Sequence, residues 1–169
     1  GDVEITEKTA KALMEKCPEH DIIITAESKG IPLAYEMARI GCRQYVVARK
    51  GIKAYMTNPI KVEVKSITTD HIQTLYLSEE DCAMLKGKRI LIVDDVISTG
   101  ESLSALEDLV HEIGGNVVGK AAVGVAHGHS LVAFYGLAGI SLGKGSAGEF
   151  LKAFRSAKQC RRAVGPAGV

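Results

Sequence analysis

The 169-residue sequence predicts an α/β domain with a mainly parallel sheet that is flanked by helices on both faces. Two observations support this fold class. Short apolar segments that suit buried strands alternate with segments whose apolar residues are spaced for one face of a helix. Prolines and glycines separate these segments, and neither a repeat nor a linker divides the first two thirds of the chain.

The first three elements follow from the signals at their ends. Thr6 is suited to cap a helix whose apolar residues share one face, and Pro18 ends that helix. The apolar run at residues 21–26 predicts a buried strand. A second helix is expected after Gly30, because Pro32 fits the first turn of a helix.

The middle of the chain predicts three strands and a short helix. Residues 45–48 form an apolar strand. Apolar and charged residues alternate strictly over residues 60–65, which indicates a strand with one buried face. Residues 66–70 suit the turn of a hairpin, and residues 71–77 suit its return strand. The run at residues 78–81 predicts the start of a brief helix.

The last predicted unit consists of a strand, a helix and another strand. Residues 89–95 form an apolar strand that ends in two aspartates. The helix after it buries Leu103 and Leu106 on one face, and the Gly-Gly-Asn run at residues 114–116 ends it. Residues 117–125 predict the last core strand.

Glycine content and charge change toward the end of the chain. Residues 124–148 hold seven glycines, and residues 113–169 carry seven basic side chains but one acidic side chain. We therefore divide the chain into an α/β core at residues 1–125 and a basic tail, rich in small residues, at residues 126–169. A basic tail could contact nucleic acid or an acidic partner. A solvated tail is the simpler interpretation, and we expect no nucleic-acid partner.

Composition excludes several classes of protein. Hydrophobic residues make up 46% of the chain, which is typical of a globular domain. The longest apolar run, residues 131–142, is interrupted by glycines and is shorter than the roughly 20 residues of a membrane helix. The four cysteines form no Cys-x-x-Cys pair, which indicates free thiols rather than a zinc site or a disulfide framework. We expect a cytoplasmic protein without a membrane segment.

Residues 90–102 are the most informative stretch for function. Four apolar residues of a buried strand precede Asp94 and Asp95, and a turn rich in hydroxyl groups then opens a helix. Backbone N–H groups at the start of a helix attract phosphate. Carboxylates at the carboxyl end of a strand can hold ribose hydroxyls, directly or through a metal ion, and ligands of open α/β sheets bind at that end. The order of these residues indicates a sugar-phosphate site.

The same stretch resembles the phosphoribosyl pyrophosphate (PRPP) motif of type I phosphoribosyltransferases. The resemblance extends over about residues 1–123 and is closest to the adenine-type members. It implies a type I phosphoribosyltransferase-like fold in which Asp94 and Asp95 are catalytic. It also implies a turn that binds the 5′-phosphate of PRPP, made of Ser98, Thr99, Gly100, Glu101 and Ser102. Glu101 departs from the family pattern, which has a glycine at that position.

Two further loops resemble the pyrophosphate-binding parts of the adenine-type enzymes. One loop, residues 25–30, follows the first core strand, and the other follows the strand at residues 45–48. The pyrophosphate-binding residues that the resemblance implies are Ser28, Lys29, Gly30, Arg49, Lys50 and Lys53. Tyr55 would belong to a flexible loop that closes over PRPP.

The resemblance therefore predicts a transferase that converts PRPP and a nucleobase, with a purine as the expected base, into a nucleoside monophosphate and pyrophosphate. Mg²⁺ is the expected cofactor, and it would bind through PRPP near Asp94 and Asp95 rather than in a set of protein ligands. Because many type I members form dimers, we expect a homodimer.

Two alternatives stay open. A non-catalytic PRPP-binding regulator of purine metabolism genes fits two departures from the adenine-type pattern. Residues 66–69 lack the acid that those enzymes carry on the closing loop, and the sequence starts almost directly at the first core helix, before which those enzymes usually have a segment that covers the base. A receiver-type signalling domain also has paired aspartates after a strand. The loop at residues 25–30 and the basic pair Arg49 and Lys50 argue against it.

Overall fold

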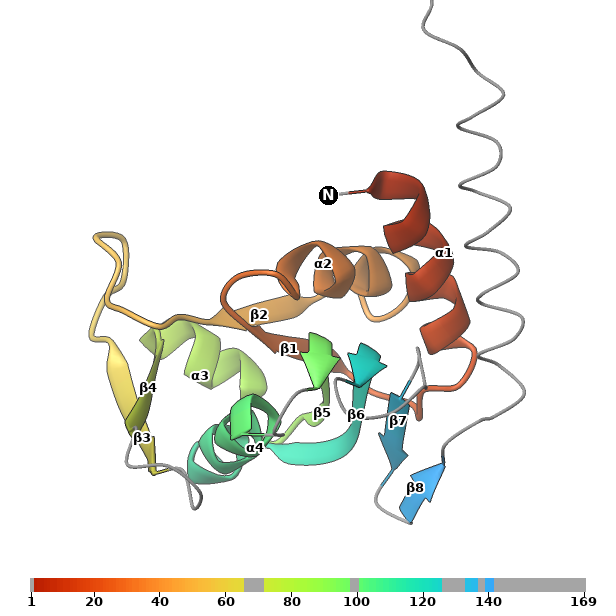
Figure 1. The fold of residues 1–169 in the computed structure, drawn as a ribbon. Coiled ribbons are helices and arrows are strands. Elements are labelled where there is room, and N and C mark those ends of the chain that lie inside the picture. The colour runs from red at the N-terminus through yellow and green to blue at the C-terminus, as the bar shows by residue number, and fades with distance from the viewer. Residues whose placement is uncertain (1, 66–71, 98–100, 126–132, 137–138, 142–169) are drawn as a thin grey trace, which may run out of the picture.

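The computed structural model of the protein describes residues 2–65, 72–97, 101–125, 133–136 and 139–141. Its centre is a six-stranded sheet with the strand order β2-β1-β5-β6-β7-β8 (Figure 1). The first four strands in this order pair in parallel, and the last two continue the sheet antiparallel. The strands are β1 (Ile22–Ala26), β2 (Tyr45–Ala48), β5 (Arg89–Ile97), β6 (Asn116–Val125), β7 (Ala133–Gly136) and β8 (Gly139–Ser141). The predicted fold class is confirmed.

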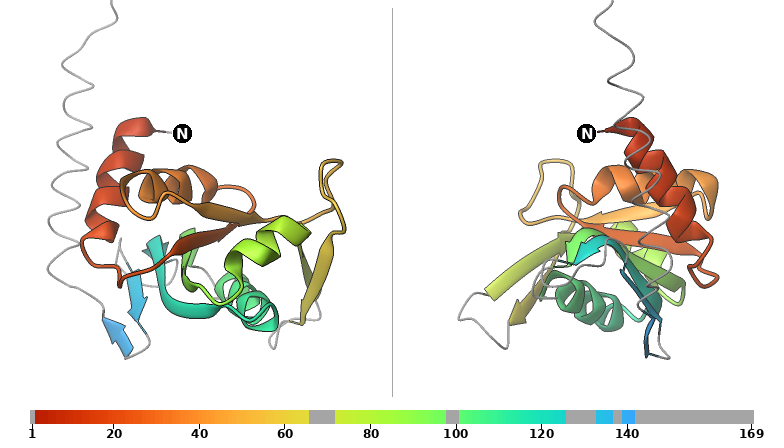
Figure 2. Two further views of the ribbon diagram at one scale, coloured as in Figure 1. Left: turned by 180° about the vertical axis from the view of Figure 1, so that it is seen from behind. Right: turned by 45° about the vertical axis from the view of Figure 1, so that its right-hand side comes forward.

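Four helices cover the two faces of the parallel part of the sheet. Helices α1 (Val3–Met14) and α2 (Ile31–Ile40) lie on one face, and α3 (Glu79–Leu85) and α4 (Glu101–Glu112) lie on the other (Figures 1 and 2). Alternate residues of each buried strand supply the two cores, because successive side chains of a strand point to opposite faces. Leu91 of β5 packs with α1 and α2, for example, whereas its neighbours in the strand pack with α3 and α4.

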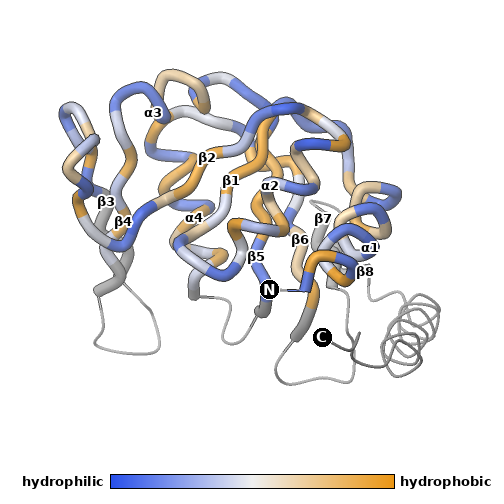
Figure 3. The backbone as a smooth tube through the Cα atoms, turned by 90° about the horizontal axis from the view of Figure 1, so that it is seen from above, coloured by the Kyte–Doolittle hydropathy of each residue, from blue (hydrophilic) through white to orange (hydrophobic). Residues whose placement is uncertain are grey.

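Hydrophobic sequence is concentrated in the strands that both layers of helices cover. The five residues of β1 are all buried, and Figure 3 shows β1 and β2 as hydrophobic stretches between more polar helices. A run without polar alternation is expected where both faces of a parallel strand are covered. The apolar run at residues 21–26 therefore predicted this central strand correctly.

A separate two-stranded hairpin stands at the β2 end of the molecule, away from β7 and β8 (Figures 1 and 2). Its strands, β3 (Ile60–Lys65) and β4 (Ile72–Leu77), are antiparallel. Arg49 and Tyr76 exchange two backbone hydrogen bonds of 2.9 and 2.8 Å, which attach the hairpin to the segment that follows β2. The hairpin prediction is confirmed, while the predicted turn at residues 66–70 lies outside the described residues.

The first helix begins earlier than the sequence predicted. Asp2, rather than Thr6, caps α1, and its side chain accepts a hydrogen bond of 3.2 Å from the backbone N–H of Ile5. Thr6 lies inside the first turn and donates its hydroxyl to the Asp2 carbonyl at 2.8 Å. Both residues are good N-cap types, and the aspartate one turn earlier takes the position.

The sheet continues beyond the strand that was predicted to be its last. Strand β6 is followed by β7 and β8, which add two antiparallel pairings at the edge of the sheet. Short strands in a glycine-rich segment lack the periodicity that identifies a strand in a sequence. The domain boundary proposed at residue 125 stays a prediction. No helix in the described part of the chain is long and apolar enough to cross a membrane.

The order of the parallel strands reverses between β1 and β5. From β1 the chain passes through α2 to β2 on one side, and from β5 it passes through α4 to β6 on the other. Because α2 and α4 lie on opposite faces, the turns that follow β1 and β5 diverge and leave a crevice at the carboxyl ends of the two strands. The fold therefore provides a ligand crevice at this point of the sheet.

Candidate functional site

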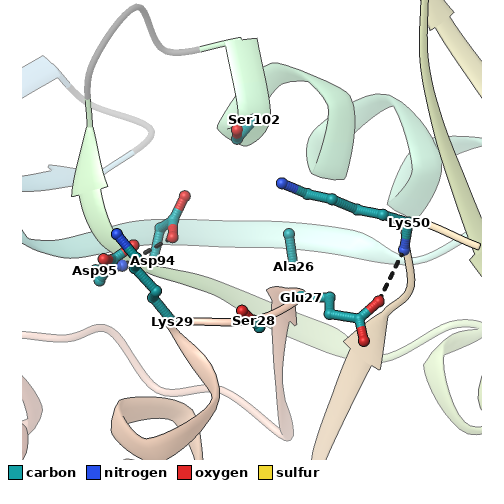
Figure 4. A pocket seen from close by; sticks show the side chains of 8 residues that line it. All are labelled: Ala26, Glu27, Ser28, Lys29, Lys50, Asp94, Asp95 and Ser102. Carbon is teal, nitrogen blue, oxygen red and sulfur yellow. Dashed lines mark hydrogen bonds between the residues drawn. The ribbon is translucent and has the colours of Figure 1, made fainter. Parts of the chain in front are cut away.

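A cavity of about 390 Å³ lies at the carboxyl ends of β1, β2 and β5 (Figure 4). Its wall is formed by four parts of the chain, namely the turn after β1, Lys50 after β2, the end of β5 and the start of α4. The residues that line the cavity are Ala26, Glu27, Ser28, Lys29, Lys50, Asp94, Asp95 and Ser102. Residues from four separate parts of the sequence therefore meet where the strand order reverses.

Asp94 and Asp95 lie within β5, near its carboxyl end, and the strand continues to Ile97, two residues beyond the predicted end at residue 95. Strand β5 pairs with β6 as far as Ile97, whereas its pairing with β1 stops at Ile92. The long partner strand extends β5, and the short one leaves the β1 side of the acidic pair open to the cavity. The sequence could not indicate this difference, because it depends on the length of two neighbouring strands.

The acidic pair is electrostatically unusual. The backbone N–H of Asp95 donates to Asp94 Oδ1 at 2.8 Å, so that one carboxylate is held against the main chain of the next residue. The pKa of Asp94 is raised to about 6, mainly by burial and then by the neighbouring carboxyl of Asp95. The hydrogen bond from the backbone of Asp95 and the charge of Lys50 lower this pKa, but by less. An acid with a pKa near neutrality in a cleft is typical of a functional site.

Gly30 allows the turn after β1 to pack directly against the acidic strand. A Cβ atom on this residue would lie 2.4 Å from Thr25 Oγ1 and 3.5 Å from the Cα of Asp94. The φ angle of Gly30 is −70°, an ordinary value, so space rather than backbone conformation requires a glycine here. The space that a side chain would need is taken by Thr25 and Asp94, and the predicted contact of Gly30 with a pyrophosphate stays a prediction.

Lys29 and Lys50 are the two basic residues that line the cavity, and Figure 4 shows their side chains on opposite sides of it. Within the described residues, neither lysine forms an ion pair, and the charge of Lys50 favours the ionised form of Asp94. A polar cavity lined by two cations and two carboxylates can bind a ligand that carries both anionic groups and hydroxyls.

Three of the six predicted pyrophosphate ligands, Gly30, Arg49 and Lys53, do not line the cavity. Arg49 and Lys53 both pair with Glu27, at 3.6 Å from Nη1 and 3.1 Å from Nζ respectively. The second oxygen of Glu27 accepts the backbone N–H of Lys50 at 3.2 Å. The peptide bond between Glu27 and Ser28 is cis. Glu27 belongs to the loop at residues 25–30, and the sequence pattern predicted no role for it.

The remaining predicted site residues are placed as follows. Ser28 and Ser102 line the cavity. Tyr55 is 66% exposed and does not line it. Glu101 begins α4. Ser98, Thr99 and Gly100 lie outside the described residues, so their predicted contact with a phosphate stays a prediction.

The described residues contain no group of three or more His, Cys, Asp or Glu side chains that could hold a metal ion by themselves. A divalent cation could nevertheless bind to Asp94 or Asp95 together with ligand oxygens and water. Mg²⁺ commonly binds through one or two carboxylates and the phosphates of a substrate. The two carboxylates at the cavity are therefore compatible with a magnesium ion that arrives with its ligand.

The family model described as "Phosphoribosyl transferase domain" matches residues 2–133. Among curated proteins, the chain is 31% identical over 110 residues to the purine biosynthesis transcriptional repressor PurR of Bacillus subtilis. This match covers 65% of this chain and 38% of the repressor. The chain is 35% identical over 102 residues to the adenine phosphoribosyltransferase of Brachyspira hyodysenteriae, which covers 60% of this chain and 56% of that enzyme. The chain thus spans less than two thirds of the length of these relatives.

Solved structures show the same fold. The adenine phosphoribosyltransferase of Thermoanaerobacter pseudethanolicus superposes with a TM-score of 0.56 at 27% identity, over 72% of this chain and 66% of that chain. The corresponding enzyme of Rhodothermus marinus gives a TM-score of 0.59 at 23% identity, over 73% and 66%. The resemblance drawn from the sequence motif is confirmed at the level of family and fold.

Proposed function

Because the chain belongs to the phosphoribosyl transferase domain family, we propose that it transfers the phosphoribosyl group of PRPP to a nucleobase, with a purine as the expected base. The products are a nucleoside monophosphate and pyrophosphate. The observation that carries this proposal is the convergence of Asp94, Asp95, Lys29 and Lys50 on one cavity at the reversal of strand order. A volume of about 390 Å³ is of the size that small-molecule sites have.

The cavity offers a separate group for each part of PRPP. The carboxylates of Asp94 and Asp95 accept hydrogen bonds from the two ribose hydroxyls. Lys29 and Lys50 hold the pyrophosphate, which leaves with the electron pair of the bond to the anomeric carbon. The start of α4, with Ser102 at the cavity, presents backbone N–H groups to the 5′-phosphate. When bound near Asp94 and Asp95, Mg²⁺ would neutralise part of the charge on the pyrophosphate.

The chemistry requires positioning and charge stabilisation more than covalent catalysis. As the carbon–oxygen bond to pyrophosphate breaks, the ribose ring gains positive charge, and the nearby carboxylates of Asp94 and Asp95 stabilise it. The base nitrogen then forms the new bond to the anomeric carbon and loses its proton to the leaving pyrophosphate or to solvent. Holding base and sugar in line converts a bimolecular step into one within a complex. Asp94 must be ionised for this role, and its pKa of about 6 leaves it mostly ionised at pH 7.5.

The second candidate function is a PRPP-binding regulator that does not transfer the sugar. The match to the PurR repressor of Bacillus subtilis favours it, because this match and those to adenine phosphoribosyltransferases have similar identity. The same residues would hold PRPP in both cases. The difference lies in whether a base can bind and be attacked, and residues 66–69, where adenine-type enzymes carry an acid, contain none.

A pyrophosphate-release assay with PRPP, Mg²⁺ and a panel of purine and pyrimidine bases separates the two candidates. Release that depends on one base supports the transferase. PRPP binding without release for any base supports the regulator. If PRPP does not bind at all, both candidates are wrong. Asp21→Asn serves as a matched control, since Asp21 lies at the other end of β1 and pairs with Arg89.

A further inference from the structure

Glu27 connects two loops at the edge of the cavity. Its carboxylate contacts three groups of one short segment, namely the side chains of Arg49 and Lys53 and the backbone N–H of Lys50. Its own backbone N–H donates to the carbonyl of Ala48 at 2.9 Å. Residue 27 therefore fastens the segment after β2 to the turn after β1 through both its main chain and its side chain.

The contacts of Glu27 are of the kind that an anionic ligand makes. An arginine, a lysine and a backbone N–H form a common binding set for phosphate oxygens. In this structure the carboxylate of Glu27 occupies that set. The side chains of Glu27, Arg49 and Lys53 are 22%, 26% and 37% exposed, so the cluster is partly shielded from solvent rather than a pair on the open surface.

The basic residues near the cavity are thus divided into two groups. Lys29 and Lys50 line the cavity and form no ion pair within the described residues, whereas Arg49 and Lys53 share the single carboxylate of Glu27. A ligand with two phosphate groups carries more negative charge than two lysines balance. The two cations that contact Glu27 lie close to Lys50 in the sequence. Arg49 directly precedes Lys50, and Lys53 follows it by three residues.

We propose that Glu27 acts as an internal competitor of the diphosphate: in the ligand-free protein it holds Arg49 and Lys53, and an entering diphosphate displaces it and takes these two cations. This inference rests on the proposed function, because the diphosphate is the pyrophosphate part of PRPP or free pyrophosphate. The exchange moves the segment at residues 49–56 only when a diphosphate is bound. Part of the binding energy is used to break the contacts of Glu27.

Glu27→Gln tests the exchange directly, because glutamine keeps the size of the side chain and removes its charge. We expect this variant to bind pyrophosphate with Mg²⁺ about three- to fivefold more tightly than the wild type, since the ion pairs that the ligand must replace are partly exposed and therefore weak. Glu19→Gln is the matched control, because it removes a carboxylate that pairs with Arg89 at 3.1 Å, far from the cavity in the sheet. The control should bind like the wild type. Isothermal titration calorimetry measures all three proteins.

Trypsin provides a second readout on the same proteins. Arg49, Lys50 and Lys53 are trypsin sites within the segment that Glu27 fastens. In the absence of ligand, Glu27→Gln should be cleaved there faster than the wild type and than Glu19→Gln, while thermal unfolding shows that the fold is kept. In a Lys53→Met background, the gain in pyrophosphate affinity from Glu27→Gln should shrink.

The outcomes distinguish this inference from the proposed function. If the wild type binds PRPP or pyrophosphate but Glu27→Gln binds with equal or lower affinity, Glu27 supports the ligand-binding loop and does not compete, and the inference is overturned while the function stands. If the wild type binds neither compound, the function and the inference are both wrong. Tighter binding by Glu19→Gln as well would attribute the effect to net charge and also overturn the inference.

Discussion

The charged side chains at the two ends of strands β1 and β5 differ in how they are paired. At the amino ends, Arg89 pairs with Asp21 at 2.8 Å and with Glu19 at 3.1 Å, and the backbone N–H of Arg89 also donates to Asp21. At the carboxyl ends, Asp94 and Asp95 are adjacent and form no ion pair within the described residues. The acidic pair at the carboxyl ends thus has no ion-pair partner among the described residues, whereas the charges of Arg89, Asp21 and Glu19 at the amino ends are paired.

The pKa values of two aspartates reflect this contrast. Hydrogen bonds from Arg89 lower the pKa of Asp21 to about 2, whereas burial raises the pKa of Asp94 to about 6. A lowered pKa means that the ionised group stabilises the fold, and a raised pKa means that ionisation destabilises it. The ion pair between Arg89 and Asp21 therefore joins the amino ends of the two strands. At the carboxyl ends, the carboxylates of Asp94 and Asp95 stay available to bind a ligand.

The largest effect is expected for Asp95→Asn. This change keeps the size of the side chain but removes a carboxylate that stabilises the developing charge on the ribose. A loss of about 3 kcal/mol of transition-state stabilisation corresponds to a roughly hundredfold lower turnover. Pyrophosphate release from PRPP and the preferred base measures it. Full activity in a folded variant would remove Asp95 from the mechanism.

Gly30→Ala should come next, because the new methyl group would meet Thr25 Oγ1 at 2.4 Å in the turn beside Asp94. Crowding of this kind costs about 2 kcal/mol of unfolding free energy. Gly51→Ala is the matched control, since a Cβ there has no heavy atom within 4 Å. Chemical denaturation measures both variants. In a Thr25→Ala background the penalty for Gly30→Ala should fall, and an unchanged penalty would show that Thr25 is not the obstacle.

Asp94→Asn should increase stability while it weakens PRPP binding. The folded-state pKa of Asp94 is about 6 and lies above the unfolded value of 3.8, so ionisation destabilises the fold increasingly between pH 4 and pH 6. Above pH 6 the unfolding free energy of Asp94→Asn should exceed that of the wild type by about 1 kcal/mol, because the carboxyl is partly exposed. Near pH 3.5 the two proteins should unfold alike. A variant that is less stable than the wild type at pH 7.5 would contradict the assignment.

The smallest effect is expected for Asp21→Asn at the opposite end of the sheet. Because the folded-state pKa of Asp21 is lowered from 3.8 to about 2, its contribution to stability is present above pH 4 and disappears as the pH falls through 2. The variant should therefore be slightly less stable than the wild type at pH 7. The difference in stability between the two proteins should become smaller as the pH falls. Thermal unfolding across this pH range measures it, and a wider gap at low pH would contradict the argument.

Much of the fold could be predicted because its signals are local. Strands β1 and β2 are apolar runs, Pro32 lies in the first turn of α2, and Ser78 caps α3 in a box with Asp81. The features that were missed depend on pairing between distant segments. The extension of β5 beyond Asp95 depends on β6, and β7 and β8 are too short to show a period.

The candidate site divides in the same way. The acidic pair and the loop with Lys29 could be predicted, because both follow apolar strands and strand ends meet at one edge of a parallel sheet. The pairing of Glu27 with Arg49 and Lys53 could not, because it joins side chains that are 22 and 26 residues apart in the sequence. Sequence patterns identify the charged residues near a site, but not which of them neutralise one another.

Calorimetric titration with PRPP and Mg²⁺ tests the central claim most directly, namely that the cavity at the carboxyl ends of β1 and β5 binds a phosphorylated ribose. We predict that the wild type and Asp21→Asn bind PRPP with similar affinity, and that Asp95→Asn binds it far more weakly. Absence of binding by the wild type, or equal binding by all three proteins, would contradict the claim.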